Sequence, residues 1–303
     1  MYPIIIIGGG PIGLNSALLA SAHGIHVLLL ESSDVLGGQL SELYPEKEIV
    51  DIPSIPCIQA QGYVTGLVKE IRAKANLIDV HMNEKALTIS KYENHLEVGT
   101  TSNKYEAQNV IIATGLGTFV PRTMGLPGEE NTSNILYFLQ TLDSLRGKKI
   151  LILGGGDSAL DWAKMISRVS NDVTLIHRRR EFRGDFKTIE AIPTIKIKTP
   201  FVPITILKKD SMLTSLIIQN VETSEKEELA ADFVFVNFGH IPSVESFGLE
   251  KQGVGIKVND RYETPLPHVF AVGDVSGYEG KIKRIAPGLA EALQVINQIV
   301  NQD

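Results

Sequence analysis

Short apolar runs that stop at glycines or charged residues open the chain. Residues 4–7 are four isoleucines followed by three glycines, and residues 26–30 are a second, mostly apolar run that ends at Glu31. Between them, residues 11 to about 23 carry apolar side chains at helical spacing. Because a buried parallel strand is apolar along its whole length, this order predicts a strand–helix–strand unit.

The second half of the chain repeats this order of strand, glycines, helix and strand, at residues 149–153, 154–156, 157 to about 168 and 172–176. Gly8 and Glu31 are 23 positions apart, and so are Gly154 and His177. The chain therefore uses the same supersecondary unit twice.

Further strands are predicted after each unit, at residues 86–90, 95–99, 110–113, 204–207, 213–219 and 233–237. An amphipathic helix is predicted over Ile285–Val300. The predicted fold class is α/β, with two Rossmann-type, three-layer dinucleotide-binding domains. The first domain is discontinuous (residues 1–117 and 241–303), and the second (residues 118–240) is inserted into it.

Composition narrows the class of protein. The chain has 303 residues, which suits two domains, and 43% of them are hydrophobic. The formal net charge is −6, so the chain is not built to coat nucleic acid. No apolar stretch approaches the ~20 residues that a membrane-spanning helix needs, and no basic segment precedes the isoleucines as in a secretory signal. We therefore expect a cytoplasmic protein without a membrane segment.

Cys57 is the single cysteine of the chain. One cysteine makes no internal disulfide and no zinc cluster of CxxC type, and we predict no metal site. Its flanking residues offer no basic group that would lower its pKa, which favours a small apolar role over a reactive thiol.

The first glycine motif is Gly8-x-Gly10-x-x-Gly13. It follows a predicted strand and opens a predicted helix, where free N–H groups and the helix dipole bind a pyrophosphate. Glu31 ends the next strand, where a carboxylate accepts both ribose hydroxyls. In this context the motif favours dinucleotide binding over an ordinary glycine turn.

The second motif, Gly154-x-Gly156-x-x-Ala159, has the same context but opposite charge at the ribose position. His177 stands where the first unit has Glu31, and it is followed by Arg178, Arg179 and, further on, Arg183. A carboxylate would repel a 2′-phosphate, whereas arginines pair with it. We predict NADPH here and an adenine dinucleotide without a 2′-phosphate at the first motif. The alternative is a solvated basic turn.

Two more apolar runs end in turns that suit FAD at the first motif. Residues 110–115 read VIIATG, and residues 269–274 read VFAVGD. Asp274, at a strand end, is placed to hydrogen-bond a ribityl hydroxyl or a group beside the pyrophosphate.

The set GGGPIG, GGQL, IIATG, GGGDSA, HRRxxxR and VFAVGD resembles the thioredoxin-reductase-like flavoproteins over nearly the whole chain. The segments at 37–47 and 154–162 look most like the bacterial ferredoxin/flavodoxin–NADP⁺ reductases. The resemblance implies an FAD site formed by Gly8, Gly10, Pro11, Gly13, Glu31, Gly38, Gln39, Leu40, Tyr44, Ala113, Thr114, Gly115, Asp274, Ile285 and Ala286. It implies an NADPH site formed by Gly154, Gly155, Gly156, Asp157, Ser158, His177, Arg178, Arg179, Arg183 and Gly239.

The resemblance also implies roles near the flavin. Gln39 and its neighbours line the isoalloxazine, Tyr44 stacks on one of its faces, and Asp274 holds the FAD chain. Ile285 and Ala286 place the N-terminus of the last helix at the pyrimidine end of the flavin, where it stabilises the reduced anion.

The implied reaction passes a hydride from NADPH to FAD and then electrons to a ferredoxin or flavodoxin. The flavin does the chemistry, so no catalytic side chain is predicted. Lys281, Lys283 and Arg284, with the arginine turn at 178–183, are expected to dock an acidic partner. The family implies a homodimer.

Two departures from the family pattern matter. Residues 134–146 hold no CxxC, so a dithiol relay is excluded. The chain also ends three residues after Val300, without the extension of reductase-type relatives, so we expect the flavin face opposite Tyr44 to be open or covered by another element. Two alternative functions remain: an NADPH reductase of quinones, free flavins or oxygen, and a non-catalytic NADPH sensor.

Overall fold

A computed structural model describes residues 1–52, 55–139, 141–184 and 186–301. The chain forms two compact units, Met1–Thr118 with Pro242–Asp303, and Phe119–Ile241. The units change at 118/119 and 241/242, one residue from the domain limits expected at each crossing. The chain passes between them in two paired strands, β9 (Thr118–Pro121) and β18 (His240–Ser243).

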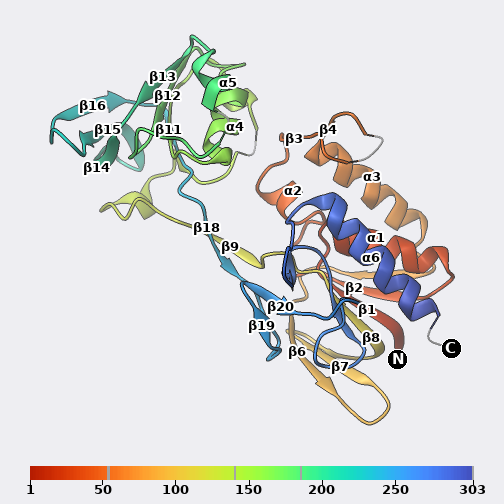
Figure 1. The fold of residues 1–303 in the computed structure, drawn as a ribbon. Helices are drawn as coiled ribbons and strands as arrows, with labels where there is room; N and C mark the ends of the chain where they lie inside the picture. Colours follow the sequence, from red (N-terminus) through yellow and green to blue (C-terminus); the bar gives the residue numbers. More distant parts are fainter. Residues whose placement is uncertain (53–54, 140, 185, 302–303) are drawn as a thin grey trace. The chain divides into compact units, whose positions relative to one another are not determined.

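The first unit is built on a seven-stranded sheet (Figure 1). Five of its strands run parallel, in the order β5 (Ile78–His81), β2 (Val27–Leu30), β1 (Tyr2–Ile7), β8 (Lys104–Ile112) and β21 (Val269–Ala271). Two antiparallel strands complete the sheet: β7 (Leu96–Thr100) pairs with the first half of β8, and β6 (Ala86–Lys91) pairs with β7. Strand β8 begins earlier than predicted. Its first half pairs with β7 and has only one buried face, so exposed polar residues interrupt the continuous apolar run on which the prediction was based.

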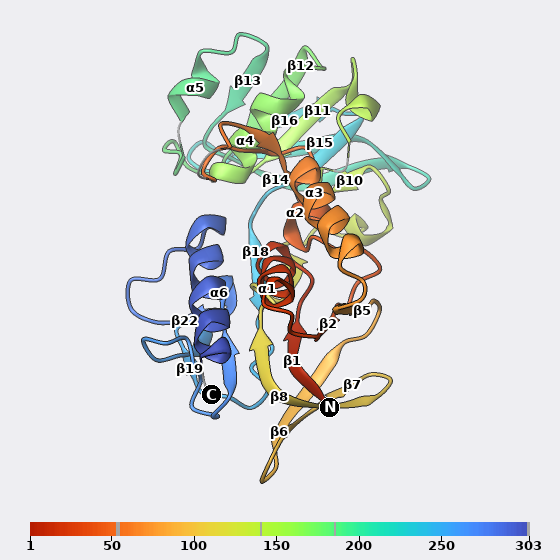
Figure 2. The ribbon, with the colours of Figure 1, turned by 90° about the vertical axis from the view of Figure 1, so that its right-hand side faces the viewer.

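Successive isoleucines of β1 point to opposite faces of the sheet. Ile4 and Ile6 pack with helices on one face, whereas Ile5 and Ile7 pack with β20 (Gly255–Lys257) and the hairpin on the other. The helices are α1 (Pro11–Ala22), α3 (Ala60–Ala73) and α6 (Ile285–Val300). Both views place α1 and α6 side by side (Figures 1 and 2).

Short elements complete this unit: α2 (Gln39–Glu42), β3 (Glu48–Ile49), β4 (Ile58–Gln59), β19 (Lys251–Gln252), β20 (Gly255–Lys257), the 3₁₀ turn η3 (Gly273–Val275) and β22 (Ser276–Gly277). Strands β19, β20 and β22 form a small sheet, and η3 connects β21 to it.

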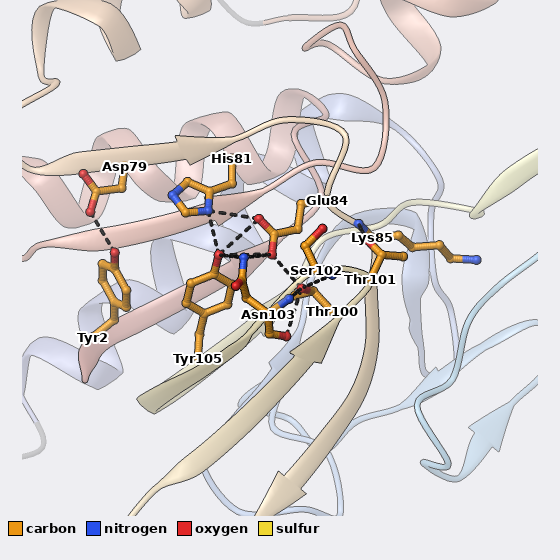
Figure 3. A network of polar contacts seen from close by, with 10 residues as sticks. All are labelled: Tyr2, Asp79, His81, Glu84, Lys85, Thr100, Thr101, Ser102, Asn103 and Tyr105. Atoms are coloured by element: carbon orange, nitrogen blue, oxygen red, sulfur yellow. Dashed lines mark hydrogen bonds and ion pairs between the residues drawn. The ribbon is translucent and has the colours of Figure 1, made fainter.

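A polar network fastens the end of β5 to the hairpin (Figure 3). The buried Glu84 carboxylate accepts hydrogen bonds from Thr100 Oγ1 at 2.6 Å and Tyr105 Oη at 3.0 Å, and Nδ1 of His81 lies 3.1 Å from it. Burial alone would raise the pKa of Glu84, but these bonds and one from Asn103 outweigh it and lower the pKa.

The second unit has a five-stranded parallel sheet, in the order β10 (Ile135–Leu136), β17 (Phe233–Val236), β11 (Lys149–Leu153), β12 (Asp172–Ile176) and β13 (Ile195–Lys198). An antiparallel sheet packs on it, formed by β14 (Phe201–Lys209), β15 (Met212–Asn220) and β16 (Lys226–Ala230). The helices are α4 (Asp157–Ile166), α5 (Phe186–Glu190) and the 3₁₀ turns η1 (Glu129–Asn131) and η2 (Asp143–Leu145). Helix α4 packs Trp162 edge-on against Phe235 of the sheet.

No described helix has both the length and the apolar run needed to cross a bilayer.

Candidate functional site

The first glycine loop joins β1 to α1 and is closed by backbone contacts. Gly8 has φ +108°, and a Cβ there would lie 2.7 Å from the carbonyl oxygen of Ala113. A Cβ on Gly13 would overlap the carbonyl oxygen of Gly8. Gly10 differs, because a Cβ there would meet no described atom within 4 Å. The middle glycine is therefore the one that leaves backbone open to an approaching pyrophosphate, with Pro11 as the first helical residue.

Glu31, at the end of β2, is tied to the same loop. Its Oε2 accepts a hydrogen bond from Gly9 N at 2.6 Å, and its Oε1 accepts one from Ser33 N at 2.8 Å and one from Ser32 Oγ at 3.1 Å. A carboxylate has about four lone-pair sites, so acceptor capacity remains for one further hydroxyl group. The Glu31 side chain is thus fixed beside the first loop.

Three segments distant in sequence meet at this loop. A Cβ on Gly38 would lie 3.2 Å from the Cα of Gly10, and a Cβ on Gly115 would lie 3.6 Å from Nε2 of Gln39. Leu40 and Ile285 pack in one small apolar cluster. The structure therefore brings together the GGQL segment, the turn after β8 and the beginning of α6, as the resemblance implies.

The turn at Gly273 and Asp274 adjoins the same loop from the other side. Gly273 has φ +74°, and a Cβ there would lie 3.1 Å from the side chain of Ile12 in α1. A Cβ on Gly288 of α6 would meet Ile12 and Gly273. Burial raises the pKa of Asp274, Lys281 and Lys283 oppose this, and Glu291 adds to it. The described residues offer no hydrogen bond to the Asp274 carboxylate, which leaves it available to a ligand hydroxyl.

Three buried side-chain oxygens have no partner among the described residues: Asn109 Oδ1 within β8, and one beside each glycine loop. Thr114 Oγ1 is one, in the turn after β8 beside Ala113. Asn237 Oδ1 is another, directly after β17. Buried polar atoms are usually hydrogen-bonded, so an orphan beside a glycine loop is what a missing polar ligand would leave.

The second glycine loop, between β11 and α4, repeats the first. Gly154 lies against β17, because a Cβ there would come within 2.6 Å of the carbonyl oxygen of Asn237. Gly156, like Gly10, faces no described atom within 4 Å. The third position is Ala159 instead of a glycine, and its Cβ would lie 2.9 Å from a Cβ on Gly154. Asp157 and Ser158 are the first two residues of α4.

The arginine turn after β12 folds back over this loop. A Cβ on Gly155 would overlap the imidazole of His177, and Arg183 N donates to the carbonyl oxygen of Gly155 at 2.9 Å. Phe182 lies 5.0 Å from the His177 ring and stacks on Phe186 at 4.2 Å. The turn is therefore anchored at its base.

The charges of the turn are not equivalent. Arg180 pairs with Glu222 through two hydrogen bonds, of 3.1 and 2.5 Å. Arg178, Arg179 and Arg183 are exposed and have no ion pair within the described ranges. Burial lowers the pKa of His177, the three arginines push it the same way, and a hydrogen bond with the backbone of Glu181 opposes them.

Two further predicted residues, Tyr44 and Gly239, are not buried. Tyr44 is half-buried, with Lys47 Nζ 5.7 Å from its ring centroid. Gly239 is exposed with φ +87°, and its carbonyl oxygen accepts from Arg122 N at the start of the crossing strands, two residues past Asn237.

The expectation that Lys281 faces a docking partner is wrong. Its side chain is only 8% exposed and pairs with the buried Glu291. Arg284 is exposed but bridges to Asp51 at 2.6 Å, which leaves Lys283 of the three cations without an ion pair among the described residues. A lysine in a charged loop looks solvated in sequence, and its partner lies ten positions away on a helix.

Sequence reasoning missed two residues at these sites. Asn237 is the last residue of the strand predicted at 233–237, and the carboxyl ends of parallel strands line the ligand crevice, so its position carried a signal. Glu291 lies on an amphipathic helix and carried none.

Two units, each with a largely or wholly parallel sheet and a glycine loop that opens a helix, define a two-domain dinucleotide-binding protein. Residues 2–292 match the family described as pyridine nucleotide-disulphide oxidoreductase. The chain belongs to this family. The membership confirms the predicted fold class and the predicted type of enzyme, an FAD oxidoreductase that uses NADPH.

Relatives cover nearly the whole chain. A Streptococcus mutans protein named ferredoxin--NADP reductase is 38% identical over 307 residues, which are 99% of this chain and 91% of its own length. A Listeria monocytogenes protein named ferredoxin--NADP reductase 2 is 37% identical over 309 residues, 99% of this chain and 93% of its own. The structure of Lactococcus lactis thioredoxin reductase matches with a TM-score of 0.83 at 25% identity, covering 99% of this chain and 98% of that one. These findings confirm the resemblance stated from the motifs.

Proposed function

We propose that the protein is a ferredoxin–NADP⁺ reductase of the thioredoxin-reductase-like type, with FAD in the first unit and NADPH in the second. The observation that carries this proposal is the contrast between two matched loops. Gly10 and Gly156 are both open, but the strand end beside the first carries Glu31 and the one beside the second carries His177 and free arginines. When bound, the two cofactors supply the redox chemistry, a hydride transfer followed by release of single electrons.

The first unit fits FAD. The open backbone at Gly10 and the N-terminus of α1 suit a pyrophosphate, and Glu31 suits the adenosine ribose. Thr114, with its unpartnered hydroxyl oxygen, and Asp274 offer polar groups to the rest of the molecule. Gln39, Leu40 and the first residues of α6 lie together at the same loop and would surround the ring system.

The second unit fits NADPH. Gly156 and the N-terminus of α4 would take the pyrophosphate. Arg178, Arg179 and Arg183 would hold the 2′-phosphate, while Arg180 stays with Glu222. Asn237 offers an unpartnered oxygen beside the loop.

For the electron acceptor we propose a ferredoxin or flavodoxin, supported by the names of the relatives at 37–38% identity. A dithiol relay is excluded by the single cysteine. We also propose a homodimer, as the family resemblance implies, and a location in the cytoplasm.

A panel of acceptors tests this function. Purified yellow protein with NADPH should turn over rapidly with ferredoxin or flavodoxin and slowly with thioredoxin or quinones. Faster turnover with quinones, free flavins or oxygen would favour the small-acceptor alternative. A flavin that NADPH does not bleach would favour the sensor.

A further inference from the structure

A buried carboxylate on α6 collects four donors from the loop that follows β21. Glu291 is 2% exposed, and its oxygens accept hydrogen bonds from Gly273 N (2.7 Å), Ser276 Oγ (3.3 Å), Tyr278 Oη (2.7 Å) and the Lys281 ammonium. About four lone-pair sites are available on a carboxylate, so this one is saturated.

The ion pair inside this cluster is fully enclosed. The side chains of Lys281 and Glu291 are 8% and 2% exposed, and the ammonium also lies 5.1 Å from the ring centroid of Tyr278. Removing one partner of such a pair leaves a buried charge without compensation, whereas removing both is far better tolerated. The two charges therefore act as a unit.

The cluster lies against the proposed FAD-binding turn. Glu291 accepts a hydrogen bond from Gly273 N directly, and Gly273 precedes Asp274 and lies beside Ile12 of the first glycine helix, where a Cβ on it would be 3.1 Å away. Lys281 and Glu291 both act electrostatically on Asp274. Helix α6 thus reaches back from its second turn to hold the segment that carries the predicted ribityl contact.

We propose that Glu291 is a positioning residue for flavin binding. With Lys281 it fixes the Gly273–Asp274 turn, and the opposite charges of the two side chains cancel beside that turn. This inference rests on the proposed FAD site in the first unit. It assigns Glu291 and Lys281 to cofactor positioning and removes Lys281 from partner docking.

The experiment compares four variants of the full chain: Glu291→Leu, Glu291→Gln, Lys281→Met, and Glu291→Gln with Lys281→Met. Leucine removes the acceptor for Gly273 N, whereas glutamine keeps an acceptor and removes only the charge. The dissociation constant of FAD is measured on refilled apoprotein, and the flavin midpoint potential on the holoprotein. Circular dichroism of each apoprotein checks that it folds.

We expect changes in both the FAD dissociation constant and the flavin midpoint potential. Glu291→Leu should raise the FAD dissociation constant at least tenfold, and the double variant less than threefold. Glu291→Gln leaves the ammonium unpaired and should raise the potential, because a nearby positive charge favours the reduced anionic flavin. Lys281→Met should lower it, and the double variant should return it to the wild-type value. A tenfold change in the reduction equilibrium corresponds to about 30 mV for a two-electron couple.

A structural role alone would move all variants in the same direction. The proposal is overturned if Glu291→Leu folds and binds FAD like the wild type, or if the two single variants do not shift the potential in opposite directions. If Glu291→Leu fails to fold, the flavin midpoint potentials of the other three variants test the proposal. Glu129→Gln is the matched control, because this buried carboxylate also accepts several backbone N–H groups and a tyrosine hydroxyl but lies in the second unit. A wild-type protein that binds no FAD would instead refute the proposed function.

Discussion

The backbone N–H of Gly9 donates to Oε2 of Glu31 over 2.6 Å, so the carboxylate at the end of β2 is locked onto the first glycine loop. The second unit has the same arrangement with different chemistry, since Gly155 lies against the ring of His177. Both strand ends are held at matched places, one by a hydrogen bond and one by ring packing. The charge at each place, and not its position, therefore distinguishes the two proposed cofactors.

Replacing Arg178 and Arg179 together by alanine should raise the KM for NADPH roughly tenfold or more and leave the KM for NADH nearly unchanged. Hydrogen bonds to a charged group contribute about 1.5–3 kcal/mol, and a factor of ten corresponds to about 1.4 kcal/mol. Initial rates with both nucleotides measure this.

Arg180→Ala is the matched control for the arginine pair. Its guanidinium is already paired with Glu222, so the KM for NADPH should stay within about twofold. Equal use of NADH by the wild type would contradict the assignment of this turn to a 2′-phosphate.

Gly156→Ala should leave the fold intact and weaken NADPH binding. A Cβ at this position meets no described atom, and φ is −99°, which any residue adopts, so the unfolding temperature should not change. The methyl group would instead occupy the space through which a pyrophosphate approaches the backbone. The measurements are thermal unfolding without ligand and NADPH titration of the same preparation.

Gly154→Ala should behave in the opposite manner. Its Cβ would lie 2.6 Å from the carbonyl oxygen of Asn237 and φ is +153°, so unfolding should shift to lower temperature even without ligand. If Gly156→Ala binds NADPH as tightly as the wild type, the pyrophosphate does not lie at this loop.

Much of this arrangement could be predicted because it is local in sequence. The bounds of β11, β12 and α6 agree with the apolar patterns at residues 149–153, 172–176 and 285–300. A run of apolar residues between glycines and a charged residue leaves little choice of element or of end point. Helix α4 ends at Ile166, slightly before the expected position, because Arg168 N bonds to the carbonyl oxygen of Met165, three residues back, instead of continuing the α-helical pattern.

The residues that were missed or misplaced depend on contacts distant in sequence. Glu291 bonds Gly273, 18 positions earlier, and along an amphipathic helix an acidic residue looks like part of the solvated face. Lys281 looks solvated because it lies in a charged loop, ten positions before its partner. Only the packing of α6 against α1 and the turn after β21 buries both, and no periodicity in the chain encodes that packing.

Cys57→Ser should retain full NADPH-dependent activity, and the protein should reduce thioredoxin poorly. Cys57 is exposed, and a single thiol cannot carry two electrons through an internal disulfide. Steady-state rates with NADPH and the preferred acceptor provide the measurement. A serine variant that keeps FAD but loses all turnover would instead indicate a thiolate or sulfenate mechanism.

Glu84→Gln should destabilise the first unit near neutral pH, and the difference from the wild type should shrink in acid. The hydrogen bonds around Glu84 lower its pKa in the folded state below the ordinary value of 4.5, so the folded protein binds fewer protons than the unfolded chain (Figure 3). The stabilisation is therefore fully present above pH 4.5 and is lost as the pH falls through the folded pKa. Because glutamine keeps some of these bonds, the loss in free energy of unfolding near pH 7 should be about 1–3 kcal/mol.

Urea unfolding at several pH values measures this loss. Tyr105→Phe is a partial variant, because it removes one donor, and its loss in free energy of unfolding should be smaller. A difference between wild type and Glu84→Gln that grows below pH 4.5 would mean that the carboxylate is not the ionised centre of this network.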